Sequence, residues 1–73
     1  MKKRSISIAG HATSFSLEDE FWSALKRSAD LNGRSVASLV AEIDGQRNGS
    51  LNLSAAIRVY LLKAAIAGEL NDK

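Results

Sequence analysis

Residues 4–17 read RSISIAGHATSFSL, and this stretch decides the fold. Polar and apolar residues alternate over residues 4–9 and again over residues 12–17, and a period of two predicts β-strands. Gly10-His11 between the two segments suits a two-residue turn that places Ile8 opposite Thr13. The hairpin then has an apolar face formed by Ile6, Ile8, Phe15 and Leu17, and a small polar face formed by Ser5, Ser7, Ala9, Ala12, Ser14 and Ser16. Because an isolated hairpin is marginal in water, the apolar face needs a covering layer.

Two helices are predicted to follow the hairpin directly. Residues 16–19 read SLED and resemble a capping box with Ser16 as the N-cap of the first helix. Asn32-Gly33 is a typical helix end, since glycine readily adopts the left-handed conformation found there. Ser35 is predicted to cap the second helix, whose inward apolar residues are Val36, Leu39, Val40 and Ile43.

A third helix is predicted after a polar loop at residues 45–50. Asn52 or Ser54 is its expected cap, and it reaches to about Ala67, with Gly68 as its stop. It has two apolar stripes, one of Leu53, Ile57, Tyr60, Leu61 and Ala64 and a second of Val59, Leu62 and Ile66. A helix that is apolar over most of its circumference is buried on most sides, and a monomer this small cannot cover it. The sequence therefore predicts a homodimer.

The composition narrows the class of protein. A 73-residue chain forms one domain and buries a small core, so it needs further stabilisation. The absence of cysteine excludes disulfides and thiolate metal sites, and the single histidine has no clustered carboxylates beside it in sequence. No cofactor and no metal are expected. No nucleophile is paired with a base and an orienting group, and there is no phosphate-binding glycine loop, so no enzyme is expected.

The charge of the chain is distributed unevenly. The net charge is only +2, but residues 1–17 contain three positive charges and no negative one. No apolar run approaches the ~20 residues of a membrane span, so a cytoplasmic protein without a membrane partner is expected. Residues 1–3 are interpreted as a basic arm, residues 4–67 as the domain and residues 68–73 as a C-terminal tail.

The order of these elements resembles a known family. The likeness is carried by residues 13–17 (TSFSL), by Leu25 and Ala29, and by residues 33–40 (GRSVASLV). A strand, a helix, a glycine turn and a serine-capped helix in this order resemble the ribbon-helix-helix (Arc- and MetJ-type) DNA-binding family, in particular a subgroup of short bacterial proteins. The resemblance implies a mainly α fold with a short N-terminal β-ribbon, an additional C-terminal helix, and an intertwined homodimer.

The resemblance also implies a DNA-binding site. Ribbon strands of two chains pair, the ribbon enters the major groove, and the start of the second helix meets the phosphate backbone. The implied base-facing residues are Ala12, Ser14 and Ser16, with Phe15 and Leu17 in the core. The implied phosphate-binding residues are Arg34, Ser35, Val36 and Ala37, and the flexible basic arm comprises Lys2, Lys3 and Arg4.

Two functional interpretations follow. The first is a transcriptional regulator such as a repressor or an antitoxin-like autoregulator, bound to double-stranded DNA. The second is a protein-interaction module with the same dimer fold and little DNA readout. It is suggested by the Ala and Ser residues on the outward face of the ribbon, where DNA-reading ribbons typically have Arg, Lys, Asn or Gln. The sequence also leaves open whether residues 4–9 form a separate strand or one long bent strand with residues 12–17. A strand at residues 4–9 that pairs with the ribbon would change the face presented.

Overall fold

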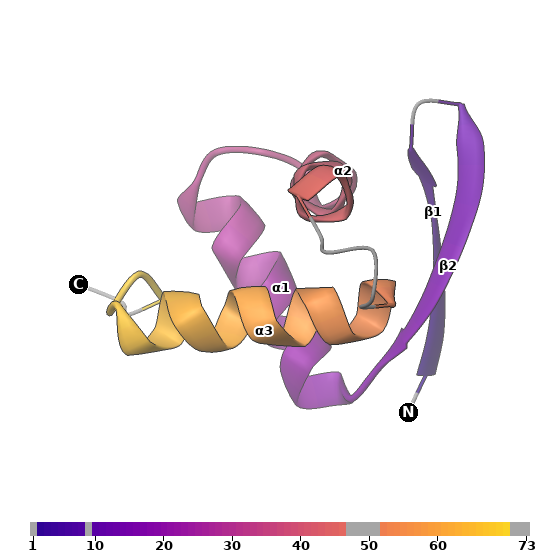
Figure 1. Ribbon diagram of the computed structural model, residues 1–73. Helices are drawn as coiled ribbons and strands as arrows, with labels where there is room; N and C mark the ends of the chain where they lie inside the picture. Colours follow the sequence, from indigo (N-terminus) through magenta and orange to yellow (C-terminus); the bar gives the residue numbers. More distant parts are fainter. Residues whose placement is uncertain (1, 9, 47–51, 71–73) are drawn as a thin grey trace.

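The computed structural model describes residues 2–8, 10–46 and 52–70. Strands β1 (Lys2–Ile8) and β2 (His11–Leu17) form an antiparallel two-stranded ribbon. Helices α1 (Asp19–Leu31), α2 (Val36–Gln46) and α3 (Leu53–Ile66) follow. All three helices lie on one side of the ribbon, as Figure 1 shows, and α1 and α3 cross beneath α2. The expected ribbon followed by three helices is therefore confirmed, with β1 and β2 as separate strands.

The core lies between the ribbon and the helices. Phe15 and Leu17 point into it from β2, with 5 % and 0 % of their surface exposed, as their place in the sequence pattern predicts. The helices contribute Leu25, Ala29, Leu39, Val40, Ile43, Leu53, Ala56, Ile57 and Leu61 to the same cluster. The apolar face of the hairpin thus receives its covering layer from the helices of its own chain.

The register of the hairpin differs from the sequence prediction. Ile8 pairs with His11 and Ile6 with Thr13, whereas the predicted turn placed Ile8 opposite Thr13. Gly10, at a φ of +83°, therefore lies in the connection that precedes His11. A shift of two residues leaves every side chain on its original face, so the hydrophobic pattern could not distinguish the two registers. The observed register pairs all of Lys2–Ile8 with His11–Leu17, including the lysines that were expected to form a flexible arm.

The helix ends correct two further predictions. The N-cap of α1 is Glu18, which makes no side-chain capping bond, while the predicted cap Ser16 lies within β2. Strand pairing of Ser16 with Lys3 keeps it extended, so the capping box does not form. Gly45, predicted to begin a loop, lies inside α2, and residues 47–50 of that loop are outside the described residues.

The end of α1 and the start of α3 follow the predictions. Gly33 has a φ of +66°, and the Arg34 N–H bonds to the Ala29 carbonyl at 3.0 Å, which is the bond pattern of a glycine-terminated helix. Asn52 caps α3, since its side-chain oxygen accepts a hydrogen bond from the Ala55 N–H at 2.8 Å. None of the helices within residues 2–8, 10–46 and 52–70 has the length and apolar character needed to cross a bilayer.

The two apolar stripes of α3 have different surroundings. Most of the first stripe is buried, and Ile57 has no exposed surface. Residues of the second stripe remain exposed: Val59 by 40 %, Leu62 by 58 % and Ile66 by 78 %. A single chain therefore covers one stripe of the helix and leaves the other on the surface.

Candidate nucleic-acid interface

The ribbon has an outward face made of small residues. Alternation along β2 places Ala12 and Ser14 on the surface and Ser16 at a half-buried position, on the side away from the core. Their directly opposite partners on β1 are Ser7, Ser5 and Lys3, which are all exposed. The structure therefore brings the three predicted base-facing residues together on one surface.

Ser16 is partly covered because helix α3 reaches the end of the ribbon. The backbone N–H of Ser16 donates a hydrogen bond to the Ser54 hydroxyl at 3.1 Å. The neighbouring Glu18 carboxylate accepts a hydrogen bond from Arg58 Nε at 3.0 Å. Ser54 and Arg58 of α3 therefore attach this helix to the junction between β2 and α1. Sequence reasoning missed this attachment, because it joins residues about 40 positions apart.

The ionised form of the Glu18 carboxyl group is stabilised at this junction. Its own backbone N–H, followed by the Arg58 guanidinium, donates hydrogen bonds that lower the pKa of the Glu18 carboxyl. In the sequence, Glu18 belongs to the predicted capping box of residues 16–19. Its ionised carboxylate instead has a structural partner in α3.

The three cations of the expected basic arm lie in different places. Lys2 and Lys3 are exposed, and Lys3 shares the outward face with the serines. Arg4 points to the inner face, with its guanidinium carbon 4.3 Å from the centre of the Trp22 ring. Its Nη2 lies 3.8 Å from an Asp19 carboxylate oxygen, and its buried Nε has no hydrogen-bond partner in the described structure. Arg4 therefore packs against α1 and stands apart from Lys3.

The start of α2 has the predicted serine cap. The Ser35 hydroxyl accepts a hydrogen bond from the Ser38 N–H at 3.0 Å. Val36 and Ala37, the next two residues, are half-buried in the first turn of the helix. Arg34 is directed along the helix, where it bonds to the Ser38 hydroxyl at 2.9 Å and to the Glu42 carboxylate. The predicted phosphate-binding residues are thus contiguous, but Arg34 already has an anionic partner.

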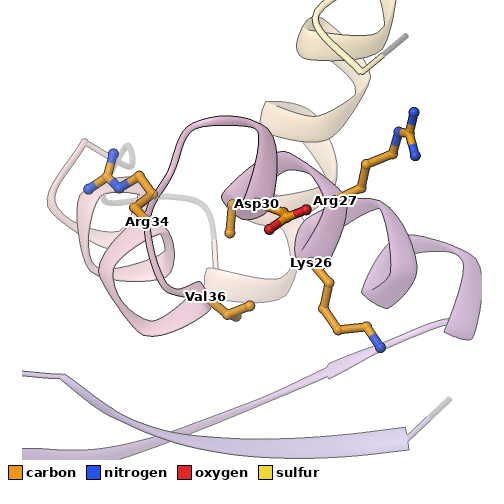
Figure 2. A pocket seen from close by; sticks show the side chains of 6 residues that line it. Lys26, Arg27, Asp30, Arg34 and Val36 are labelled. Carbon is orange, nitrogen blue, oxygen red and sulfur yellow. The ribbon is translucent and has the colours of Figure 1, made fainter. Parts of the chain in front are cut away.

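A shallow hollow of about 510 Å³ lies between the end of α1 and the start of α2. Figure 2 shows the side chains of Lys26, Arg27 and Arg34 leaving it in different directions, with Asp30 between them. Arg27 Nε donates a hydrogen bond to the Leu70 carbonyl at 2.8 Å, which holds it against the C-terminal turn. The three cations do not converge on one point of this hollow. Lys26, which sequence reasoning did not single out, extends toward the strands.

No metal-binding cluster is visible in this part of the molecule. Across residues 2–8, 10–46 and 52–70, no three His, Asp or Glu side chains gather closely enough to hold a metal ion.

Removal of the Ser35 cap is expected to destabilise the fold. Ser35→Ala deletes the acceptor of the Ser38 N–H at the first turn of α2, and loss of such a cap costs about 1 kcal/mol. The free energy of unfolding, measured by urea denaturation, should fall by that amount. Ser23→Ala, at an exposed position of α1, is the matched control and should have a much smaller effect. Equal free energies of unfolding for Ser35→Ala and the wild type would show that the cap does not contribute to stability.

Comparison with known families identifies the fold. The family model described as ribbon-helix-helix domain matches residues 1–65, which include both strands and almost all of α3. Neither the curated proteins nor the solved structures gave a match. Ribbon-helix-helix domains are DNA-binding, regulator-type modules that typically act as dimers and have no enzymatic role of their own. With its outward-facing ribbon and its serine-capped second helix, the chain belongs to the ribbon-helix-helix family.

Proposed function

We propose that the protein is a homodimeric regulator that binds double-stranded DNA with its β-ribbon in the major groove. The observation that carries this proposal is the exposed, small-residue face of the ribbon in a chain of a DNA-binding family. Ala12, Ser14 and Ser16 face the base edges, and Lys2 and Lys3 lie near the phosphates. The capped start of α2, formed by Ser35, Val36 and Ala37, offers backbone N–H groups to a further phosphate. Arg34 is held beside it by Ser38 and Glu42.

The small outward side chains favour recognition of groove shape. A serine hydroxyl donates and accepts hydrogen bonds, but it cannot form the bidentate pairs by which longer side chains distinguish bases. A close fit of the ribbon backbone to the groove makes binding depend on the width and deformability of the DNA. The protein is therefore expected to prefer a class of groove geometry, with direct base contacts adding less.

The dimer is supported by the surface that one chain leaves uncovered. Val59, Leu62 and Ile66 form an exposed apolar row on α3. Burial of apolar surface contributes about 25 cal/mol per Å², so covering this row by a second chain is favourable. In a dimer, each chain also contributes a ribbon strand to the one β-ribbon that enters the major groove.

A protein-interaction role is the second candidate. Beside the exposed row of α3, an apolar hollow of about 210 Å³ is lined by Glu20, Phe21, Ala24, Leu61, Leu62, Ala65 and Leu70. An antitoxin-like module would bind another protein through such a surface. Absence of binding to any duplex at low salt, including the promoter of its own gene, would favour this second role.

DNA binding is expected to weaken with salt, and Lys3 to account for part of the dependence. Each phosphate neutralised on duplex DNA contributes about −0.9 to the slope of log affinity against log salt concentration. Lys3→Gln removes one lysine from each subunit and should make that slope shallower by about 0.9 per subunit, or about 1.8 for the dimer, as measured by fluorescence anisotropy over a salt series. Lys63→Gln removes the same charge from an exposed position of α3 and should leave the slope unchanged. Equal slopes for both variants would show that Lys3 does not neutralise a DNA phosphate.

A further inference from the structure

Helix α3 attaches to the end of β2 at two points that lie one helical turn apart. The Ser54 hydroxyl accepts a hydrogen bond from the Ser16 N–H at 3.1 Å. Arg58 Nε donates a hydrogen bond to the Glu18 carboxylate at 3.0 Å. Four residues of an α-helix rise about 6 Å, and two residues of an extended chain rise about 6.6 Å. The two donors and acceptors on α3 are therefore spaced like their partners along the end of the ribbon.

The residues beside these two contacts hold the same elements together in the core. Leu17 lies between Ser16 and Glu18, and it has no exposed surface. Ile57 precedes Arg58 on α3 and is equally buried, in the same core cluster as Leu17. The core fixes the distance between α3 and the chain. Because the polar contacts lie on either side of Leu17, they fix the direction of the chain as well.

Glu18 is the residue at which the ribbon ends and α1 begins. Its backbone is extended, with a φ of −63° and a ψ of 153°, and its carbonyl accepts a hydrogen bond from the Trp22 N–H at 2.9 Å. Its side chain makes no capping bond with α1 and pairs with Arg58. The guanidinium carbon of Arg58 also lies 5.8 Å from the centre of the Phe21 ring, in the first turn of α1. Arg58 therefore contacts the chain on both sides of the junction.

The two parts of the chain that are proposed to face DNA are connected through this junction. The base-facing residues lie on β2, before Glu18, and the phosphate-binding start of α2 follows α1. A rotation at Glu18 would move the ribbon relative to the start of α2. Base and phosphate contacts can form together without an ordering cost only when this angle is fixed before DNA binds.

We infer that Arg58 is a positioning residue for DNA binding, which fixes the angle between the ribbon and α1 through the Glu18 carboxylate and does not contact DNA itself. Ser54 supports the same junction through the Ser16 N–H. The inference rests on the proposed DNA binding and assigns the third helix a part in it. A direct phosphate contact is the competing role for a cationic side chain, and the two roles differ in their dependence on salt.

The first experiment replaces Arg58 by Gln. Affinity for a DNA site selected with the wild-type protein is measured by fluorescence anisotropy, at a temperature at which circular dichroism shows both proteins fully folded. A residue that only stabilises the fold leaves this affinity unchanged. Arg58→Gln should lower it by about fivefold and leave the salt slope unchanged, because no phosphate loses a neutralising charge. Lys63→Gln, at an exposed position of the same helix, should change neither quantity.

Two results of this experiment would overturn the inference. The first is a folded Arg58→Gln protein with wild-type affinity. The second is a salt slope shallower by about 0.9 per subunit, which would make Arg58 a phosphate contact.

The second experiment uses the sign of the charge on Glu18. Glu18→Gln removes a negative charge from a protein that binds a polyanion, so electrostatics alone predict tighter binding. The inference predicts weaker binding, and the double variant Glu18→Gln/Arg58→Gln should bind no more weakly than the weaker single variant, because both disrupt one ion pair. Glu20→Gln, at an exposed position of α1, should not lower the affinity. Tighter binding by Glu18→Gln, or additive losses in the double variant, would contradict the inference.

A third experiment tests the attachment without DNA. Ser54→Ala removes the acceptor of the Ser16 N–H, and amide hydrogen exchange at Ser16 should become about fivefold faster or more. Unchanged exchange at Ser16 would show that Ser54 does not hold this junction. A wild-type protein that binds no duplex at low salt would instead overturn the proposed function, while faster exchange in Ser54→Ala would still establish the attachment.

Discussion

Replacement of Ile57 by Asp is expected to leave the chain unfolded under conditions in which the wild-type protein is folded. Ile57 has no exposed surface and belongs to the core cluster shared by β2 and the three helices. Loss of a buried aliphatic side chain costs roughly 1.5–3 kcal/mol, and an unpaired buried charge costs several more. A small domain has a free energy of unfolding of only about 5–15 kcal/mol. Far-ultraviolet circular dichroism should show the loss of the helical signal.

Lys63→Asp provides the matched control for Ile57→Asp. It introduces the same carboxylate on the same helix, at an exposed position, and surface substitutions usually change stability by less than about 1 kcal/mol. A folded Ile57→Asp protein would contradict the packing described for α3. Sedimentation of the wild-type protein tests the proposed homodimer. A compact monomer at micromolar concentration would contradict it.

Ser14→Phe is expected to abolish DNA binding without unfolding the protein. Ser14 lies at the middle of the outward face and is exposed. A phenylalanine is readily accommodated in a strand, but its ring would hold the ribbon away from the floor of the groove. Affinity for the selected site should fall to the level of non-specific binding in a gel-shift assay.

The Ser14→Ala variant distinguishes recognition of groove shape from direct readout of the bases. If shape dominates, the loss of one hydroxyl should change discrimination between the selected site and random DNA by no more than about 1 kcal/mol. A larger loss would assign Ser14 a direct base contact. A folded Ser14→Phe protein with unchanged affinity and specificity would exclude the ribbon-in-groove arrangement altogether.

Local patterns in the sequence were sufficient to predict the elements and their faces. Alternation alone places Phe15 and Leu17 in the core and Ser14 on the surface, because successive strand residues point to opposite sides. The caps formed by Ser35 and Asn52 involve residues three positions apart, and Gly33 ends its helix through neighbouring residues. Such features depend on short-range geometry and are visible in one sequence.

Features that depend on tertiary packing could not be predicted in the same way. The observed hairpin register differs from the predicted one by two residues, a difference that a pattern of period two cannot detect. Arg4 was grouped with Lys2 and Lys3 by its charge, yet its face of the strand brings it over Trp22. The Ser16 cap was wrong because strand pairing and the contact with Ser54 keep that residue extended. In each case a distant partner decides the role of the residue.

The hydrogen bond between Ser16 and Ser54 also has a consequence for synthesis of the protein. The two residues are 38 positions apart, so the strand is synthesised well before its hydrogen-bond acceptor. Until the start of α3 has been synthesised, the edge of β2 that faces away from β1 presents free backbone groups. Such edges pair readily with other strands. Synthesis of the third helix supplies the Ser54 hydroxyl, which occupies this edge at Ser16.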